Sequence, residues 1–304
     1  MIFVFGSCNA DMVMNVSRHP NPGETLLSEN YTLYAGGKGA NQAVAAARAN
    51  APVTLVGAIG SDHFGPFILN SMNNDHKRYH LNLEHMIRLD APTGCAVIAV
   101  DPTGENTIIV SGGANLRLSA RHFPLTLVQE NDFLILQMEV PLSENWALAE
   151  QISAKGGRIL LNAGPALPIP AHILKLLDVL VVNWHEVKVL NEHAETPFSD
   201  NQQLALWAAQ HFNMHVIITL GGEGAFMAEP SGQIHQMPAH PIHVVDTVAA
   251  GDTFVGYFAA ALHRGESAKY ALKSSLIASG LACTRPGAQA SIPHWQEVEA
   301  LLIA

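Results

Sequence analysis

The segment DTVAAGDTF, residues 246–254, carries the side chains best suited to chemistry in this chain. Three small residues, 249–251, stand directly before Asp252 at the expected start of a helix. Backbone N–H groups at such a start have no helical partner, so they form a nest that can hold the charge developing on a phosphoryl group. A carboxylate there can accept a proton from an alcohol, and the helix dipole favours its ionised form. The alternative is a simple N-cap, which the second carboxylate, Asp246, makes less favoured.

A glycine-rich segment, Ala35–Gln42, opens an alanine-rich stretch of helical character. Its sequence, AGGKGANQ, has three glycines in four residues, which permits positive φ angles and close approach of a ligand to the backbone. Lys38 and Asn41 can hydrogen-bond hydroxyls or an anion beside the free N–H groups of the helix start. The segment matches neither the GxxxxGK[ST] nor the GxGxxG phosphate-binding loop. It predicts either a binding loop or a tight strand-to-helix turn.

Polar pairs follow two of the expected strands. Asn183 and Glu186 lie three positions apart after an apolar run, so they share one face of a helical turn. They could order water around Mg²⁺ or contact phosphate oxygens, although the same spacing also gives a capping box. Asn9 and Asp11 follow the first apolar run and could bind vicinal hydroxyls, with a plain turn as the alternative.

A second glycine-rich turn, Thr219–Gly224 with sequence TLGGEG, follows another apolar run. Glycines in such a turn let the backbone approach phosphates or an adenine ring. A hairpin turn is the simpler interpretation of the same residues.

Elements able to position these side chains alternate along the chain. Short apolar runs predict strands buried on both faces: Ile2–Phe5, Val53–Ile59, Phe133–Leu136, Ile159–Leu161, Val179–Val182 and Val216–Leu220. Apolar residues recur at helical spacing between them: Gly39–Asn50, Pro66–Asn74, Ser143–Ala154 and Asp200–His211. This alternation predicts an α/β fold, a doubly wound and mostly parallel sheet with helices on both faces.

Two stretches break the alternation early in the chain. Glu24–Tyr34 and Thr93–Ser111 have the alternating side chains typical of exposed strands. We therefore expect one domain over residues 1–304, with segments of about 11–36 and 92–112 forming a small β-sheet that stands off the main sheet.

Composition excludes several classes of function. The 304 residues include 16 Lys and Arg against 26 Asp and Glu, a formal charge of −10 at pH 7. Nucleic acids and anionic membranes attract clustered basic residues, so we expect neither as a partner. No apolar run approaches the roughly 18–20 residues that span a bilayer, and the N-terminus lacks a basic signal-peptide region. The three cysteines are widely spaced. We expect a cytoplasmic protein with reduced thiols.

The motifs GSCNAD, GGKGAN, NWHE, TLGGEG and DTVAAGDTF, in this order, resemble those of the ribokinase/PfkB carbohydrate kinase family. The resemblance runs from about Ile2 to the C-terminus, and the DTxAAGD pattern is its most specific part. It implies an ATP-dependent sugar kinase with a doubly wound α/β domain and a small β lid.

The resemblance also implies roles for individual residues. Asp252 would be the base, and the backbone of Ala249, Ala250 and Gly251 the anion hole. Sugar hydroxyls would be bound by Asn9, Asp11, Gly37, Lys38, Asn41, Glu139 and Asp252. The nucleotide and its Mg²⁺ would be served by Asn183, Glu186, Thr219, Leu220, Gly221, Gly222, Gly224 and Gly251, with Glu186 contacting Mg²⁺ indirectly. A monovalent cation, usually K⁺ in this family, would be bound by Asp246, Val248, Ala282, Arg285, Gly287 and Ser291.

Asn9, Asp11 and Glu139 fit a pentose with vicinal hydroxyls, so the expected substrate is D-ribose, phosphorylated at O5. Two departures from the family pattern leave room for another sugar or a nucleoside. The segment 162–165 reads Asn-Ala-Gly-Pro instead of Asn-Pro-Ala-Pro, and Leu276 replaces a polar residue beside the adenine. A non-catalytic sugar sensor is the alternative from another class, and a dehydrogenase is disfavoured because GxGxxG is absent. Free edges of the lid strands predict a homodimer.

Overall fold

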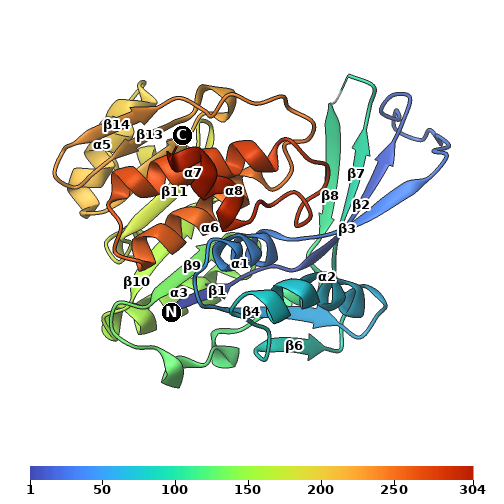
Figure 1. Ribbon diagram of the computed structural model, residues 1–304, viewed down its shortest axis with the longest axis horizontal. Helices are drawn as coiled ribbons and strands as arrows, with labels where there is room; N and C mark the ends of the chain where they lie inside the picture. Colours follow the sequence, from blue (N-terminus) through green and yellow to red (C-terminus); the bar gives the residue numbers. More distant parts are fainter. Residues whose placement is uncertain (104, 304) are drawn as a thin grey trace.

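Helices cover both faces of one large sheet in the computed structural model, which describes residues 1–103 and 105–303 (Figure 1). The order across this sheet is β14 (Ile234–Met237), β13 (Ala225–Ala228), β12 (His215–Thr219), β11 (Val179–Asn183), β10 (Arg158–Asn162), β9 (Phe133–Gln137), β1 (Ile2–Phe5), β4 (Val53–Gly60) and β5 (Leu81–Asn82). Strand β6 (Met86–Leu89) also pairs with β4. Pairing is parallel except at β13 and β14, which form an antiparallel edge.

Alternation along each strand divides the apolar core into two layers. In β1, Ile2 and Val4 join one cluster of buried side chains, and Phe3 and Phe5 join the other. The first layer is covered by α1 (Lys38–Arg48), α2 (Phe64–Arg78), α6 (Ala250–His263), α7 (Ala268–Ala282) and α8 (Trp295–Ile303). The second is covered by α3 (Leu142–Ala154), α4 (Ala171–Leu174), α5 (Asn201–Phe212) and several 3₁₀ turns. The doubly wound α/β prediction is confirmed.

A separate four-stranded sheet stands beside the main one, at the right of Figure 1. Its order is β3 (Tyr31–Gly36), β2 (Asn9–Asn15), β7 (Gly94–Val100) and β8 (Asn106–Ser111). The expected strand over Glu24–Tyr34 begins only at Tyr31, and the segment before it has no strand pairing among the described residues.

Helices α1 and α6 pack unusually closely, which matters for the site at their N-terminal ends. A Cβ on Gly256 would lie 2.5 Å from Cβ of Ala45 and 2.6 Å from the backbone oxygen of Gln42. Glycine on α6 against alanine on α1 therefore brings the two backbones together, and any larger side chain at Gly256 would force the helices apart.

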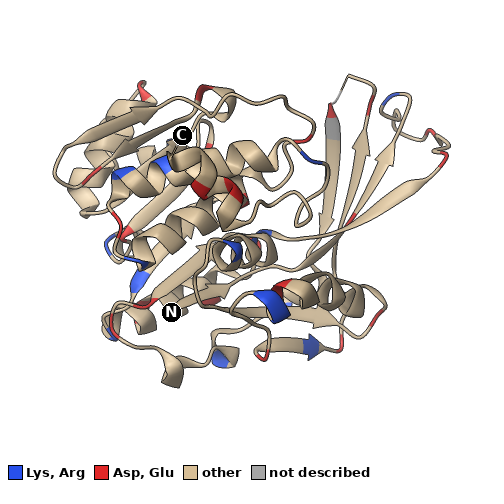
Figure 2. Ribbon diagram, viewed as in Figure 1, with Lys and Arg blue, Asp and Glu red and all other residues tan. Residues whose placement is uncertain are grey.

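Charge is distributed over the fold. Figure 2 shows Lys and Arg spread over many elements and interspersed with Asp and Glu. None of the helices in the described part of the chain combines the length and the apolar character needed to cross a membrane.

The C-terminal helix is tied to the fold through a buried arginine. Arg48, at the end of α1, makes two hydrogen bonds of 2.7 and 2.9 Å to the carboxylate of Asp75 on α2. Its third nitrogen donates to the backbone oxygens of Gln289 and Ile292, both at 2.7 Å. The side chains of Arg48 and Asp75 are only 11% and 4% exposed.

We predict that Arg48→Met lowers the free energy of unfolding by about 3–5 kcal/mol, because the Asp75 charge is left buried and unpaired. Urea denaturation followed by circular dichroism measures the change. The control is Arg18→Met, which breaks an ion pair with Glu24 whose side chains are 53% and 29% exposed. It should cost far less, because solvent screens an exposed ion pair. Equal losses in the two variants would contradict the role given to Arg48.

Candidate active site

Two adjoining cavities lie where β10, β11 and β12 end and α6 begins. The larger has a volume of about 530 Å³ and the smaller about 240 Å³. Thr219, Thr247 and Gly251 line both, so the cavities form one continuous cleft with two compartments. Carboxyl ends of parallel strands are the usual place for a binding site in an open α/β sheet.

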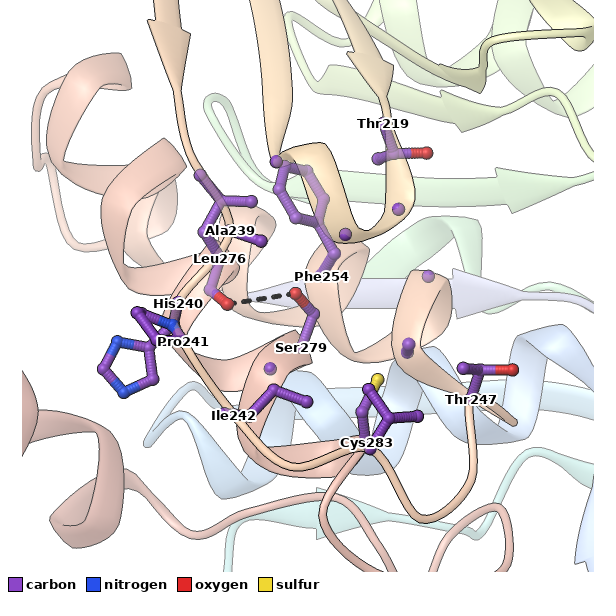
Figure 3. Close-up of a pocket in the computed structure, with 17 residues that line it drawn as sticks. Thr219, Ala239, His240, Pro241, Ile242, Thr247, Phe254, Leu276, Ser279 and Cys283 are labelled. Carbon is purple, nitrogen blue, oxygen red and sulfur yellow. Dashed lines mark hydrogen bonds between the residues drawn. The ribbon is translucent and has the colours of Figure 1, made fainter.

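The larger cavity has the size and lining of a nucleobase pocket (Figure 3). Phe254 of α6, Leu276 and Gly280 of α7, and Ile242 from the preceding loop form its apolar walls. The hydroxyl of Ser279 faces the same space but donates to the backbone oxygen of Leu276 at 3.2 Å.

The turn after β12 forms the floor of this pocket. Of the residues expected here, Thr219, Gly221, Gly222 and Gly224 line the cavity, whereas Leu220 does not. The turn also connects two antiparallel strands, β12 and β13, so the hairpin interpretation of TLGGEG is correct as well. Gly224 has φ of 102° and its backbone approaches that of Met237, so a side chain fits poorly there.

The smaller cavity gathers charged side chains. Lys38, Glu186 and Asp252 all line it, together with Asn183 and Ala249. The charge of Asp252 raises the pKa of Lys38 above its ordinary value, and the charges of Glu139 and Glu186 add to the effect. Lys38 is therefore a firmly protonated cation at the junction of the two helices.

Asp252 is the third residue of α6, since Ala249 is the N-cap and has a left-handed conformation with φ of 59°. The N-cap interpretation of Asp252 is therefore wrong. Its carboxylate instead accepts hydrogen bonds from α1: Asn41 Nδ2 to Oδ2 and Gln42 Nε2 to Oδ1, both 2.9 Å. The N–H of Ala250 donates to Thr247 O at 3.3 Å, and the first helical hydrogen bond of α6 runs from Thr253 N–H to Ala249 O at 2.8 Å. The N–H groups of Gly251 and Asp252 precede this first helical bond, so they have no partner within α6.

A third group of side chains lies on the other side of Lys38, toward the small sheet. Oε2 of Glu139 accepts from the hydroxyl of Ser7 at 2.5 Å and from the backbone N–H of Lys38 at 3.3 Å. Oδ1 of Asn9 accepts from Nδ2 of Asn115 at 2.7 Å. These bonds fix the directions in which Glu139 and Asn9 can offer their remaining polar atoms.

Gly37 connects this group to the start of α1. Its φ is 89°, and a Cβ would lie 2.7 Å from the backbone nitrogen of Asn9. Only glycine combines that backbone angle with that close approach, so the strand-to-helix turn and the binding loop proposed for AGGKGANQ are the same structure.

Asp11 adds another carboxylate near this group. It lies opposite Tyr34 in the antiparallel pairing of β2 with β3, and its carboxylate lies against Gly36. Burial, followed by the charges of Glu139 and Asp252, raises the pKa of Asp11 to about 7.

Asn183 and Glu186 form the capping box that their spacing allows. Oδ1 of Asn183 accepts from the N–H of Glu186, and Oε2 of Glu186 accepts from the N–H of Asn183, both at 2.8 Å. A Cβ on Gly164 would lie 3.2 Å from the other carboxylate oxygen of Glu186 and 3.6 Å from Nζ of Lys38. The capping box uses only Oε2, so Glu186 can cap the helical turn and still offer its other oxygen to the cavity that it lines.

Asp246 contacts two of the other residues expected around a monovalent cation. Oδ2 of Asp246 accepts from the N–H of Gly287 and Oδ1 from the N–H of Val248, at 2.9 and 3.0 Å. The buried hydroxyl of Ser291 donates to Ala288 O at 2.8 Å. Ala282 and Arg285 belong to the same chain segment, and Arg285 is ion-paired with Glu297. Backbone, hydroxyl and carboxylate oxygens are donors suited to hard cations.

Sequence patterns did not single out four buried polar residues that support the site: Ser7, Gln42, Asn115 and Asn162. Each bonds to a residue far away in the sequence, such as Asn115 to Asn9 and Gln42 to Asp252. Polar side chains within otherwise apolar or glycine-rich segments were the available signal.

Comparisons with known proteins agree with this geometry. The family model described as pfkB family carbohydrate kinase matches residues 1–295. The ribokinase of Haemophilus influenzae is 38% identical over 304 residues, covering 97% of this chain and 95% of its own. The crystal structure of ribokinase from Thermotoga maritima has a TM-score of 0.91 at 33% identity, covering 100% and 99% of the two chains.

A third relative was solved with ligands. The structure described as Arabidopsis thaliana ribokinase complexed with ribose and ATP has a TM-score of 0.85 at 30% identity, covering 99% of this chain and 98% of that one. Fold, sequence and matched length thus agree along nearly the whole chain, and the protein belongs to the pfkB family of carbohydrate kinases.

Proposed function

We propose that this sugar kinase transfers the γ-phosphate of ATP to O5 of D-ribose in the cytoplasm. The observation that carries the proposal is the place of Asp252. Its carboxylate lines the smaller cavity together with Lys38, and Asp252 lies in the first turn of α6 with the helix-start N–H groups. A base, an anion nest and a cation therefore converge where the two compartments meet.

The transfer needs little covalent chemistry from the protein. Asp252 accepts the proton of O5 while the bond from O5 to the γ-phosphorus forms and the bond from that phosphorus to the ADP oxygen breaks. The backbone of Ala249, Ala250 and Gly251, the anion hole that the family resemblance implies, would hold the charge on the transferred group. Lys38 adds a positive charge beside the same point. The sugar hydroxyl need not ionise beforehand, because proton loss accompanies bond formation.

We assign sugar binding to the polar side chains that lie between α1 and the small sheet. Asn9, Asp11 and Glu139 offer carboxylate and amide oxygens to vicinal hydroxyls, and Asn41 can offer Oδ1, which has no partner among the described residues, while Nδ2 remains on Asp252. Gly37 lets the backbone approach the ring. The small sheet acts as a lid that excludes water during transfer.

Two ions complete the proposal. Asn183 and Glu186 would hold Mg²⁺ through water, and bound Mg²⁺ would offset charge on the β- and γ-phosphates. Among residues 1–103 and 105–303, no group of three or more His, Cys, Asp and Glu side chains could hold a metal by itself, which suits an ion that relies on phosphate and water ligands. The oxygen donors around Asp246, together with Val248, Ala282, Arg285, Gly287 and Ser291, would hold K⁺ beside the anion nest.

We propose that the protein is a homodimer joined through the lid. β8 is an edge strand whose side chains Ile108, Ile109 and Val110 are 51%, 69% and 54% exposed. An edge with free backbone groups and exposed apolar side chains is suited to pairing with a second copy.

We predict that D-ribose gives the highest kcat/KM in an ADP-release assay over ribose, deoxyribose, fructose, 2-keto-3-deoxygluconate and nucleosides. Asp252→Asn should lower kcat by about 10²–10⁴-fold while D-ribose still binds, because the amide cannot accept the proton and also loses one of the two hydrogen bonds from Asn41 and Gln42. Isothermal titration measures that binding. Replacing K⁺ by tetramethylammonium in the same assay should reduce turnover. A nucleoside or hexose preferred over ribose would refute the substrate, and an active Asp252→Asn would refute the base.

Asp11→Asn should stabilise the protein and abolish sugar binding. The pKa of Asp11 is raised to about 7 in the fold, so its stabilising contribution is full below pH 4 and is lost as the pH rises through 7. The gain in Tm from asparagine should therefore grow from pH 5 to pH 8, reaching about 2–4 °C. Calorimetry at both pH values measures it.

The control for this prediction is Asp101→Asn. Hydrogen bonds from Thr103 lower the pKa of Asp101, so the substitution should not raise the Tm at either pH. A gain for Asp11→Asn that is the same at pH 5 and pH 8 would contradict the assignment of a raised pKa.

Ile109→Glu should convert the dimer to a monomer, because a charge would be buried at the pairing edge. Sedimentation velocity at micromolar concentration measures the state. Ile234→Glu is the matched control, since Ile234 is 48% exposed on β14, the edge strand of the main sheet. It should leave the dimer intact. A monomeric wild-type protein would refute the proposed homodimer.

A further inference from the structure

Gln42 is the least accessible polar side chain in contact with the proposed base. It is 0% exposed and lines neither cavity of the cleft, although its neighbours Lys38 and Asp252 do. A bound sugar or nucleotide in those cavities would therefore contact Gln42 only through other residues.

Both hydrogens of the Gln42 amide are used at the site. Nε2 lies 2.9 Å from Oδ1 of Asp252 and 3.0 Å from Oδ1 of Asn162, at the end of β10. Two acceptor oxygens face one NH₂ group, so the opposite orientation of the amide would place Oε1 against two oxygens.

The orientation is anchored in the main chain. Nδ2 of Asn162 donates to the backbone oxygen of Val181 in β11 at 3.2 Å. A backbone oxygen can only accept, so Asn162 must present Oδ1 to Gln42, and Gln42 must present its NH₂ to Asp252. A chain of polar groups thus runs from the sheet through two amides to one oxygen of the base.

The other oxygen of Asp252 is held differently. Its partner, Asn41, is itself expected to bind sugar hydroxyls, whereas Gln42 is fully buried. We propose that Gln42 is the positioning residue of Asp252: it holds Oδ1 in one place and favours the ionised carboxylate before the proton is transferred. The inference rests on the proposed function, in which Asp252 is the base.

Surrounding charges make this bond important. The charge of Asp252 raises the pKa of Lys38 on α1, whereas burial and the charges of Glu139 and Asp252 raise the pKa of Asp11 on β2, so Asp252 lies among one cation and two other acidic side chains. Glu186 competes for the same lysine. A neutral donor that is always directed at Oδ1 offsets part of that repulsion without adding another charge to the cleft.

The test replaces Gln42 by methionine, which keeps the length and removes both donors. We expect kcat at pH 7 to fall about 10–100-fold and the acid limb of the kcat pH profile to move up by about one pH unit, since the carboxylate loses a hydrogen bond that favours its charge. The Kd for D-ribose, measured by titration calorimetry without ATP, should not change. A purely structural role would not move the pH profile.

Gln42→Glu keeps the shape of the side chain and serves if the methionine variant does not fold. Its carboxylate would face Asp252 directly, so the acid limb should move further up than in Gln42→Met. Gln289→Met removes another buried amide, one held by Ser71, and should leave the acid limb at its wild-type position.

The outcomes separate this inference from the proposed function. If Asp252→Asn keeps its turnover, the base assignment fails and Gln42 has nothing to position. If Asp252→Asn loses turnover while Gln42→Met and Gln42→Glu keep the wild-type kcat and acid limb, only the role of Gln42 is overturned. A loss of kcat matched by an equal rise in the Kd for ribose also overturns it.

Discussion

The site depends on how closely α1 approaches α6. A Cβ at Gly256 would overlap the backbone and side chain of α1, so the contact is possible only because one helix offers glycine and the other alanine. At this separation, the amides of Asn41 and Gln42 reach the carboxylate of Asp252 at 2.9 Å. Wider packing would leave a buried carboxylate without its donors, which costs far more than the lost apolar contact.

Much of the main fold could be predicted because its signals are local. Strands such as Val179–Asn183 are continuously apolar, and α1 has small apolar residues at helical spacing, so local patterns locate both elements to within a few residues. The sequence did not predict β14 because its apolar pattern is weak. His235 is buried there and hydrogen-bonded to Glu229, whereas the neighbouring Ile234 is exposed. The two-residue β5 is too short to have a period.

The site was predictable in its motifs and much less in its supporting contacts. Glycines and acidic residues concentrated at helix starts identified Lys38, Asp252 and Glu186 as candidates, and the structure brings all three to one cavity. Gln42 and Asn115 could not be assigned, because their partners are 210 and 106 positions away. A buried amide gains meaning only when the fold supplies an acceptor, and no local pattern carries that information.

An acidic chain can bind ATP because the cleft does not rely on a basic surface. Lys38 is the cation in the smaller cavity, and the charge of Asp252 keeps it protonated. The same carboxylate lies near two other acidic side chains, since its charge and that of Glu139 help to raise the pKa of Asp11. Neutral donors suit such a site, because amide N–H groups on Asp252 and helix-start N–H groups on a phosphate stabilise negative charge without adding another charge. A net charge of −10 is therefore compatible with phosphoryl transfer when the donors are held rigidly by packed helices.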